Sequence, residues 1–240
     1  MADWLIIPDV HGRDFWRSAV FGHEEDPIVF LGDYLDPYPF EDVSAVDAYR
    51  ALTDIITFKK AHPENVVLLL GNHDLGYLDS EIGTCRRDYP RAFMIGQTLL
   101  ENLSLFDLVH VDGKMLFSHA GVAEDWAERN RRLCGAGDFD PMQLNTMLHD
   151  AGARSRLFSS LAQVSYHRGG SYAVGSPVWA DVDEYLGGAP LLGGYFHLFG
   201  HTLHSGGPID VNGQGFCLDC AQAFLFNTGE SMKESALTAV

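Results

Sequence analysis

The sequence predicts an α/β fold in which helices alternate with the strands of a parallel sheet. Short apolar runs of strand length recur through the first half of the chain, and longer amphipathic segments separate them. The order strand, helix, strand, helix, strand at this spacing is typical of a parallel sheet covered by helices. Hydrophobic residues make up 46% of the 240 residues, so the chain has enough apolar material for a core and is not a disordered protein.

The first half supplies the parallel strands. We expect strands over 4–8, 27–31 and 66–70, the last of which is β-branched and aliphatic. A short helix is expected over 14–21. A long helix with one buried face is expected over 43–61, because apolar residues recur there at helical spacing. These apolar residues are Val46, Tyr49, Leu52, Ile55 and Ile56.

The second half begins with helices and ends with short strands. Helical patterns cover about 91–102 and 124–161. Between them, Asp112-Gly113 favours a hairpin turn that joins 109–111 to 115–117. The later strands are expected at 196–199, 208–211, 216–219 and 223–226.

The chain is expected to form one domain over residues 1–228, because no Pro/Gly/Ser-rich spacer divides it. The stretch 124–190 is long for a connection, and we expect a helical cap or insertion there that selects the substrate. Residues 229–240 are predicted to form a polar, frayed tail.

The charge balance restricts the possible partners. The formal net charge of −17 does not suit a protein that grips a nucleic-acid duplex. It allows a small phosphorylated substrate if a bound cation reverses the local field. No apolar run is long enough to span a membrane, no signal peptide precedes the first strand, and four cysteines do not form a disulfide scaffold. We therefore expect a cytoplasmic protein without a membrane partner.

Polar clusters of the same kind follow the strands of the sheet. Because ligands bind at the carboxyl ends of strands in open α/β sheets, these clusters are expected to converge on one rim. Their carboxylate, imidazole and amide groups, without thiolate, suit Mn, Fe, Zn or Mg. The five clusters are Asp9-Val10-His11-Gly12, Gly32-Asp33-Tyr34-Leu35-Asp36, Gly71-Asn72-His73-Asp74, Ser118-His119-Ala120-Gly121 and Gly200-His201-Thr202.

In these motifs the sequence resembles the calcineurin-like metallophosphoesterases, in particular the bacterial and phage branch of the phosphoprotein phosphatases. The resemblance covers nearly the whole chain, from Asp9 to about Ala221. It implies a metallophosphoesterase fold, with a central β-sandwich flanked by helices and a binuclear metal centre.

The same resemblance implies the ligand set. Asp9 and His11 would hold the first metal ion, and Asp33 would bridge both, because a carboxylate offers two oxygens to two cations. The second ion would be held by Asn72, His119 and His201. The cofactors implied are two divalent transition-metal ions, with Mn as the first expectation and Fe, Zn or Ni as alternatives.

The resemblance also implies the reaction. A hydroxide formed from a water shared by the two metal ions would attack phosphorus in line. His73 would be the general acid that protonates the leaving oxygen, and Asp36 would orient it. A carboxylate paired with an imidazole raises the imidazole pKa and keeps this proton available.

One departure from the family pattern concerns phosphate binding. Many members continue the second motif with Arg-Gly, whereas this chain continues from Asp36 with Pro37-Tyr38. The substitute candidate is Arg168, which lies beside two glycines and could present two donors to a phosphate. A surface arginine in a solvated loop is the alternative, in which case Arg86 or Arg13 would be tested next.

Other residues invite a functional interpretation that we do not adopt. Cys217 and Cys220 form an isolated Cys-x-x-Cys, which lacks further ligands for zinc and is expected in a strand. His204 is interpreted as lying outside the ligand set, and His197 as a core residue of an apolar strand. Arg86 and Arg87 are expected in a solvated loop.

The function predicted is metal-dependent hydrolysis of phosphomonoesters by a serine/threonine-type protein phosphatase. The partner would be a phosphoprotein or a small phosphoester. Two alternatives remain. Gly71-Asn72-His73-Asp74-Leu75 also resembles the symmetrical diadenosine tetraphosphate hydrolases, and a metal-binding scaffold with an inactive site is a different class of function.

Overall fold

The first sheet contains the parallel strands that the sequence predicts. The computed structural model describes residues 3–134, 138–228 and 236–240. The strands β1 (Trp4–Ile7), β2 (Ile28–Phe30), β3 (Val66–Leu69) and β4 (Phe106–Asp107) run parallel to one another. On the other side of β1, β10 (Phe224–Phe226) and β11 (Leu237–Ala239) extend the sheet in antiparallel pairing. The sheet order is β11-β10-β1-β2-β3-β4.

A second sheet is built from the later strands. Its order is β5-β6-β7-β9-β8. In this sheet β6 (Met115–Ser118), β7 (Phe196–Phe199) and β9 (Gly215–Cys217) are parallel. The edge strands β5 (Val109–Asp112) and β8 (Ile209–Asp210) are antiparallel to their neighbours. The expected hairpin therefore forms between β5 and β6, with Gly113 at a φ of 59° in its turn.

The two sheets enclose an apolar layer. Side chains of β1 alternate between this layer and the outer side of the first sheet, as the two-residue period of a strand requires. Trp4 and Ile6 pack with Phe117, Leu198 and other residues of the second sheet. Leu5 and Ile7 instead belong to the cluster under the helices. Both faces of β1 are thus buried, which explains its continuous apolar sequence.

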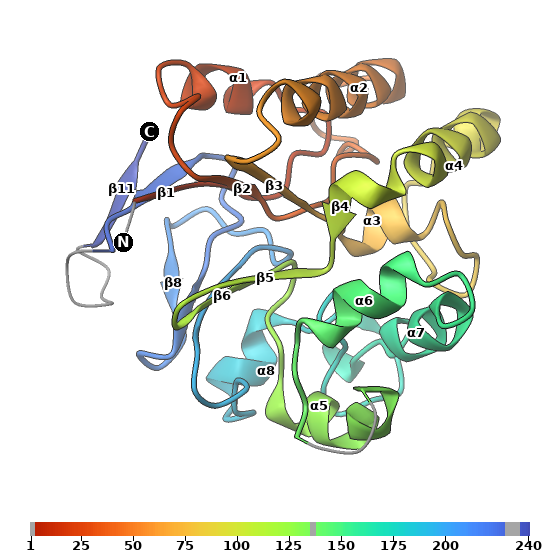
Figure 1. Ribbon diagram of the computed structural model, residues 1–240, viewed down its shortest axis with the longest axis vertical. Helices are drawn as coiled ribbons and strands as arrows, with labels where there is room; N and C mark the ends of the chain where they lie inside the picture. The colour runs from red at the N-terminus through yellow and green to blue at the C-terminus, as the bar shows by residue number, and fades with distance from the viewer. Residues whose placement is uncertain (1–2, 135–137, 229–235) are drawn as a thin grey trace.

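Helices cover the outer sides of the sandwich (Figure 1). The helices α1 (Phe15–Val20) and α2 (Ala45–Ala61) lie over the first sheet. The hydroxyl of Ser44 caps α2 by accepting a hydrogen bond from the backbone N–H of Asp47. A short helix α3 (Asn72–Leu75) follows β3, and α4 (Ala92–Glu101) precedes β4.

In the described parts of the segment 124–161, the helical pattern forms separate α-helices. They are α5 (Glu124–Asn130), α6 (Gln143–His149) and α7 (Arg154–Leu161). With α8 (Val182–Leu186) they gather on the side of the molecule away from α1 and α2 (Figure 1). None of the helices in the described ranges is long and apolar enough to cross a bilayer.

Two local expectations are wrong. The strand expected over 216–219 is β9 and ends at Cys217, so Asp219 lies beyond it. The end of the chain is not frayed throughout, because β11 pairs with β10. The first part of the expected tail, 229–235, lies outside the described residues. The strand β10 supplies the backbone hydrogen bonds of β11, and Leu237 of β11 packs against the apolar layer between the sheets.

Candidate metal centre and active site

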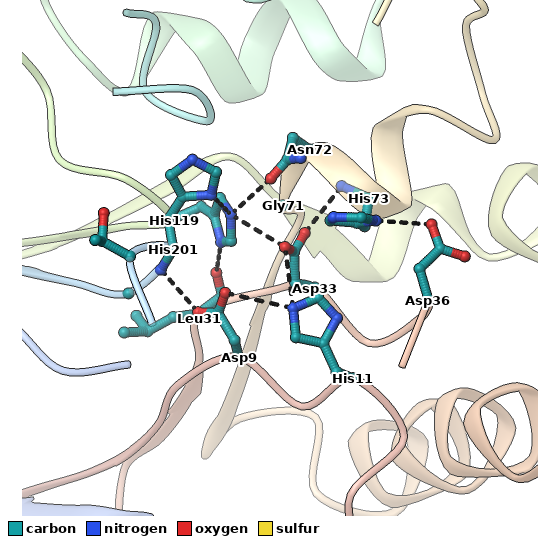
Figure 2. Close-up of polar contacts among 12 residues, drawn as sticks. Asp9, His11, Leu31, Asp33, Asp36, Gly71, Asn72, His73, His119 and His201 are labelled. Carbon is teal, nitrogen blue, oxygen red and sulfur yellow. Dashed lines mark hydrogen bonds and ion pairs between the residues drawn. The ribbon is translucent and has the colours of Figure 1, made fainter. Parts of the chain in front are cut away.

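The six metal-ligand candidates lie together at the carboxyl ends of strands from both sheets (Figure 2). The first three follow β1 and β2, Asn72 opens α3 after β3, and the last two follow β6 and β7. All six are buried, with at most 6% of any of them exposed. They are Asp9, His11, Asp33, Asn72, His119 and His201.

Asp33 is common to two overlapping groups of ligand atoms. Asp9, His11 and Asp33 offer atoms that all lie within 4.8 Å of one another, and Asp33, His119 and His201 do the same. The Oδ2 atom of Asp33 is 3.6 Å from Nε2 of His11 and 3.5 Å from Nε2 of His119. This is the arrangement that a bridging carboxylate requires.

The hydrogen bonds of two imidazoles direct lone pairs into the centre. Nδ1 of His11 lies 2.6 Å from the carbonyl oxygen of Leu35, and Nδ1 of His119 lies 2.9 Å from that of Leu31. Because a carbonyl can only accept, each Nδ1 donates, and each Nε2 carries a lone pair. Metal-bound histidines in proteins commonly donate their other ring N–H to a carbonyl oxygen in this way.

Several polar atoms of the centre face acceptors or have no partner, which shows that the centre fits cations. Nε2 of His119 lies 3.1 Å from Oδ1 of Asn72 and 3.0 Å from Nδ1 of His201. Oδ2 of Asp9 and Nε2 of His201 are buried and have no hydrogen-bond partner among the described residues. Unpaired buried polar atoms are costly. Divalent cations would pair them, and the donor set suits a transition metal.

Burial keeps two imidazoles of the centre, those of His11 and His201, in the neutral form. Burial lowers the pKa of His11 to about 3 and lowers the pKa of His201 well below its usual range. Burial raises the pKa of Asp9 to about 6. Burial also acts to raise the pKa of Asp33, but the electrostatic interaction with the neighbouring imidazoles, that of His119 first, outweighs it and lowers that pKa. Neutral imidazole and ionised carboxylate are the forms that bind metal.

The turns after the strands have an unusual backbone conformation. Four of the predicted site residues have left-handed φ values: 44° for His11, 52° for Asp33, 58° for Asp36 and 71° for His201. Such conformations are uncommon outside glycine and cluster at functional sites. The conformation keeps the chain at the centre after each strand ends.

Two glycines allow the turns to approach one another closely. A Cβ atom at Gly71 would lie 2.1 Å from Oδ1 of Asp33, and one at Gly200 would lie 2.2 Å from Oδ1 of Asp9. Any side chain at either position would therefore displace a carboxylate of the centre. This explains why glycine precedes Asn72 and His201 in their motifs.

Asp74 is a supporting residue that the sequence analysis did not single out. Its buried carboxylate accepts hydrogen bonds from the backbone N–H groups of Asp33 (2.8 Å), Tyr34 (3.0 Å) and Gly71 (2.9 Å). It therefore ties the turn after β2 to the turn after β3 and fixes the shared carboxylate. Its position directly after His73 in the third motif is the signal that could have identified it.

The predicted acid–base pair is formed beside this centre. Nδ1 of His73 lies 2.7 Å from Oδ2 of Asp36, and Tyr77 donates its hydroxyl hydrogen to Oδ1 of the same carboxylate. The backbone N–H of His73 donates to Oδ1 of Asp33 at 2.9 Å. Burial acts to lower the pKa of His73, but the charge of Asp33 and the hydrogen bond and charge of Asp36 outweigh it and raise that pKa to about 10.

Arg168, the predicted phosphate-binding residue, lies against the turn that carries His201. Its Nη2 donates to Oγ1 of Thr202 at 2.8 Å and to the carbonyl oxygen of His201 at 3.3 Å. Its Nε lies 2.6 Å from a carboxylate oxygen of Asp181. The side chain is 27% exposed, so these contacts orient a guanidinium that solvent can still reach.

The remaining polar residues near the centre contact the backbone or lie buried beside Asp9. Cys217 is buried at the end of β9, where its thiol donates to the carbonyl oxygen of Gly200. His204 contacts the carbonyl oxygen of Thr202 through Nδ1. Asp219 was missed: it is fully buried, and neither carboxylate oxygen has a hydrogen-bond partner among the described residues. Its proximity to Asp9 raises its pKa further, after the effect of burial.

Comparisons with known proteins agree with this fold and centre. The family model of calcineurin-like phosphoesterases matches residues 4–205. A cold-active protein-tyrosine phosphatase of a psychrophilic Shewanella species superposes with a TM-score of 0.59 at 12% identity, covering 95% of this chain and 76% of that one. A protein serine/threonine phosphatase from Saccharomyces cerevisiae gives a TM-score of 0.55 at 12% identity, covering 99% and 76%. These structures confirm the predicted metallophosphoesterase fold.

Proposed function

This chain belongs to the calcineurin-like phosphoesterase family, and we propose that within it the protein is a phosphomonoesterase of the serine/threonine protein phosphatase type. Family membership makes it a metal-dependent hydrolase of phosphoesters. The observation that carries the finer proposal is the buried pair of His73 and Asp36 beside Asp33. A serine or threonine leaves phosphorus as a basic alkoxide, which requires a proton from such a pair.

The chain's own residues divide into metal ligands and proton donor. Two divalent ions, held by Asp9, His11 and Asp33 and by Asp33, Asn72, His119 and His201, would supply Lewis acidity and activation of water. We propose Mn as the first metal to test. The remaining chemistry belongs to side chains that contact the substrate.

In the proposed mechanism His73 delivers a proton to the leaving oxygen. Asp36 holds Nδ1, which leaves Nε2 as the donor, and the raised pKa of His73 keeps it protonated at neutral pH. The proton passes from Nε2 to the oxygen as the bond from phosphorus to oxygen breaks. Asp36 stabilises the imidazolium before transfer, and Tyr77 holds the other oxygen of that carboxylate.

We further propose that Arg168 binds a non-bridging oxygen of the phosphate. Its contacts with Asp181 and Thr202 fix the plane of the guanidinium beside the turn of His201. A planar fork suits phosphate better than a point charge does. The segment 124–190, which carries Arg168 and Asp181, would then contribute to substrate selection.

The proposal is tested by turnover of a substrate panel with Mn-loaded protein. The panel contains phosphoserine and phosphothreonine peptides, a phosphotyrosine peptide, an aryl phosphate and diadenosine tetraphosphate. We expect the largest kcat/KM among the biological substrates for the phosphoserine or phosphothreonine peptides. Preference for diadenosine tetraphosphate would overturn the proposal in favour of a dinucleotide polyphosphate hydrolase, and inactivity on every ester would indicate a scaffold.

A further inference from the structure

Tyr38 occupies the part of the turn after β2 where the family pattern places arginine and glycine. Its ring meets the ring of His11 edge to face, with the centroids 4.9 Å apart. The guanidinium carbon of Arg86 lies 4.0 Å from the centroid of the Tyr38 ring, and that of Arg13 lies 5.4 Å from it. Both distances are within the range of cation–π attraction. Tyr38 therefore connects a candidate metal ligand with two arginines.

Arg86 is held against the proton donor rather than in a solvated loop, which corrects the expectation from the sequence. Its Nε donates to the carbonyl oxygen of Asp36 at 3.0 Å, and its Nη1 donates to Sγ of Cys85 at 3.3 Å. Its Nη2 lies 3.3 Å from Nε2 of His73. The bonds to Asp36 and Cys85 thus fix the guanidinium beside the nitrogen that would face the leaving oxygen.

The backbone of Arg86 is compatible with a functional interpretation of this placement. Its φ of 63° is left-handed, a conformation that is unfavourable outside glycine. Arg86 shares this conformation with His11, Asp33, Asp36 and His201. Asn212 and Ala221 also have left-handed φ values outside the five motifs, so the position of the Arg86 side chain, rather than its backbone, carries the functional interpretation.

The charge of Arg86 has no carboxylate partner, in contrast to Arg13 and Arg168, the other two arginines considered for phosphate binding. Arg13 pairs with Glu41 at 2.9 Å and Arg168 pairs with Asp181 at 2.6 Å. Over the described ranges, no carboxylate oxygen lies within ion-pair distance of Arg86. In a protein with a net charge of −17, an unpaired guanidinium beside a catalytic centre is a place for an anion of the substrate.

We propose that Arg86, supported by the ring of Tyr38, binds the non-bridging oxygens of the substrate phosphate in place of the arginine that is absent after Asp36. The ligand class is a phosphomonoester dianion or inorganic phosphate. On binding, Nη2 turns from His73 to a phosphate oxygen, and the leaving oxygen takes the position at Nε2 of His73. This inference rests on the proposed function, because it concerns the same site.

The test measures phosphate binding by kinetics and by competition. We would determine kcat and KM for an aryl phosphate, and the inhibition constant of inorganic phosphate, on Mn-loaded protein. Arg86→Ala should raise KM and the inhibition constant about tenfold to a hundredfold, the size of one charge-assisted contact. Metal content should stay unchanged. Arg86→Lys should recover part of the affinity, because lysine keeps the charge but loses the fork.

The matched control is Arg91→Ala, which removes one positive charge from the segment that follows Arg86. Arg91 pairs with Asp88 at 3.0 Å, so its loss should leave KM and the inhibition constant unchanged. An equal effect of both alanine variants would indicate that any positive charge near the site attracts phosphate, and it would overturn the inference.

Tyr38→Leu tests the positioning role of the ring. It should raise KM and the inhibition constant about threefold to tenfold, and it should add little in the Arg86→Ala background, since contacting residues are non-additive. Full additivity would overturn the role of Tyr38.

The two proposals fail in different ways. If wild-type protein hydrolyses the aryl phosphate and Arg86→Ala keeps both constants, the inference about Arg86 is wrong while the function stands. A loss of kcat with both constants unchanged would likewise overturn it and make Arg86 a structural support of His73. If wild-type protein has no esterase activity, yet binds inorganic phosphate through Arg86 in direct calorimetry, the inference stands and the proposed function is wrong.

Discussion

Nδ1 of His73 lies 2.7 Å from Oδ2 of Asp36, although 37 residues separate them in the chain. The pair is buried, and the backbone N–H of His73 donates to Asp33 at the same time. His73 therefore contacts Asp36 through its ring and, through its backbone N–H, the carboxylate that the two ligand groups share. A change at His73 that spares its backbone can separate proton transfer from metal binding.

Replacing His73 should impair chemistry and spare the metals. His73→Asn is expected to lower kcat for an alkyl phosphate by about 10²–10⁴, the usual contribution of a general acid, with metal content unchanged. The loss should be smaller for an aryl phosphate, because a phenolate leaves with less protonation. The measurement is kcat for both esters together with metal analysis, and equal losses on the two esters would contradict the assignment.

Replacing Asp33 should impair both ligand groups at once. Asp33→Asn removes the charged oxygen that lies 3.6 Å from His11 and 3.5 Å from His119. We expect two metal ions per wild-type chain, inactivation by chelator, and the greatest loss of metal for this variant. Metal analysis after dialysis measures the content, with Asn72→Asp as a comparison that keeps an oxygen ligand in one group. Active wild-type protein that contains one ion or none would refute this prediction.

Arg168 should contribute to phosphate binding. A charge-assisted hydrogen bond is worth about 1.5–3 kcal/mol, and 1.36 kcal/mol is about tenfold in rate. Arg168→Ala should therefore lower kcat/KM by about tenfold to a hundredfold without loss of metal, and Arg168→Lys should recover part of it. Steady-state kinetics on the aryl phosphate checks this. Unchanged kinetics would restore the interpretation of Arg168 as a surface residue.

His197 should make the stability of the fold depend on pH. Its ring is fully buried in β7, with Nε2 3.0 Å from the carbonyl oxygen of Leu192, and burial lowers its pKa from 6.5 to about 4. The imidazole of His197 binds a proton more tightly in the unfolded chain than in the folded one. The contribution of neutral His197 to the free energy of unfolding is therefore complete above pH 6.5 and is lost as the pH falls toward 4. From pH 7 to pH 5, wild-type protein should lose about 2 kcal/mol more unfolding free energy than His197→Gln.

Chemical denaturation at both pH values measures this difference. Glutamine keeps a hydrogen-bond donor for Leu192 and does not titrate, so other ionisable groups contribute equally to both proteins. An equal loss of unfolding free energy in the two proteins would show that His197 is not the titrating group.

Much of the fold and of the centre is encoded in short stretches of sequence and could therefore be predicted. The alternation of short apolar runs and amphipathic stretches predicts β1, β2, β3 and α2 to within a few residues. The polar clusters are equally local, because each follows its strand directly. Parallel strands bring the first three clusters to one rim of the first sheet, whereas the packing of the two sheets brings His119 and His201 to the same place.

Other features depend on which surfaces pack together. Asp74 bonds to Asp33 across 41 residues, and Arg86 reaches His73 through a turn that no periodicity describes. The strand β11 is too short for its apolar residues to predict a strand, and it forms because β10 offers it backbone partners and the layer between the sheets accepts Leu237. A sequence pattern reports the preference of a segment for an element or a face. It does not report which distant backbone or ring a long side chain will meet, because that contact is decided by the free energy of the assembled fold.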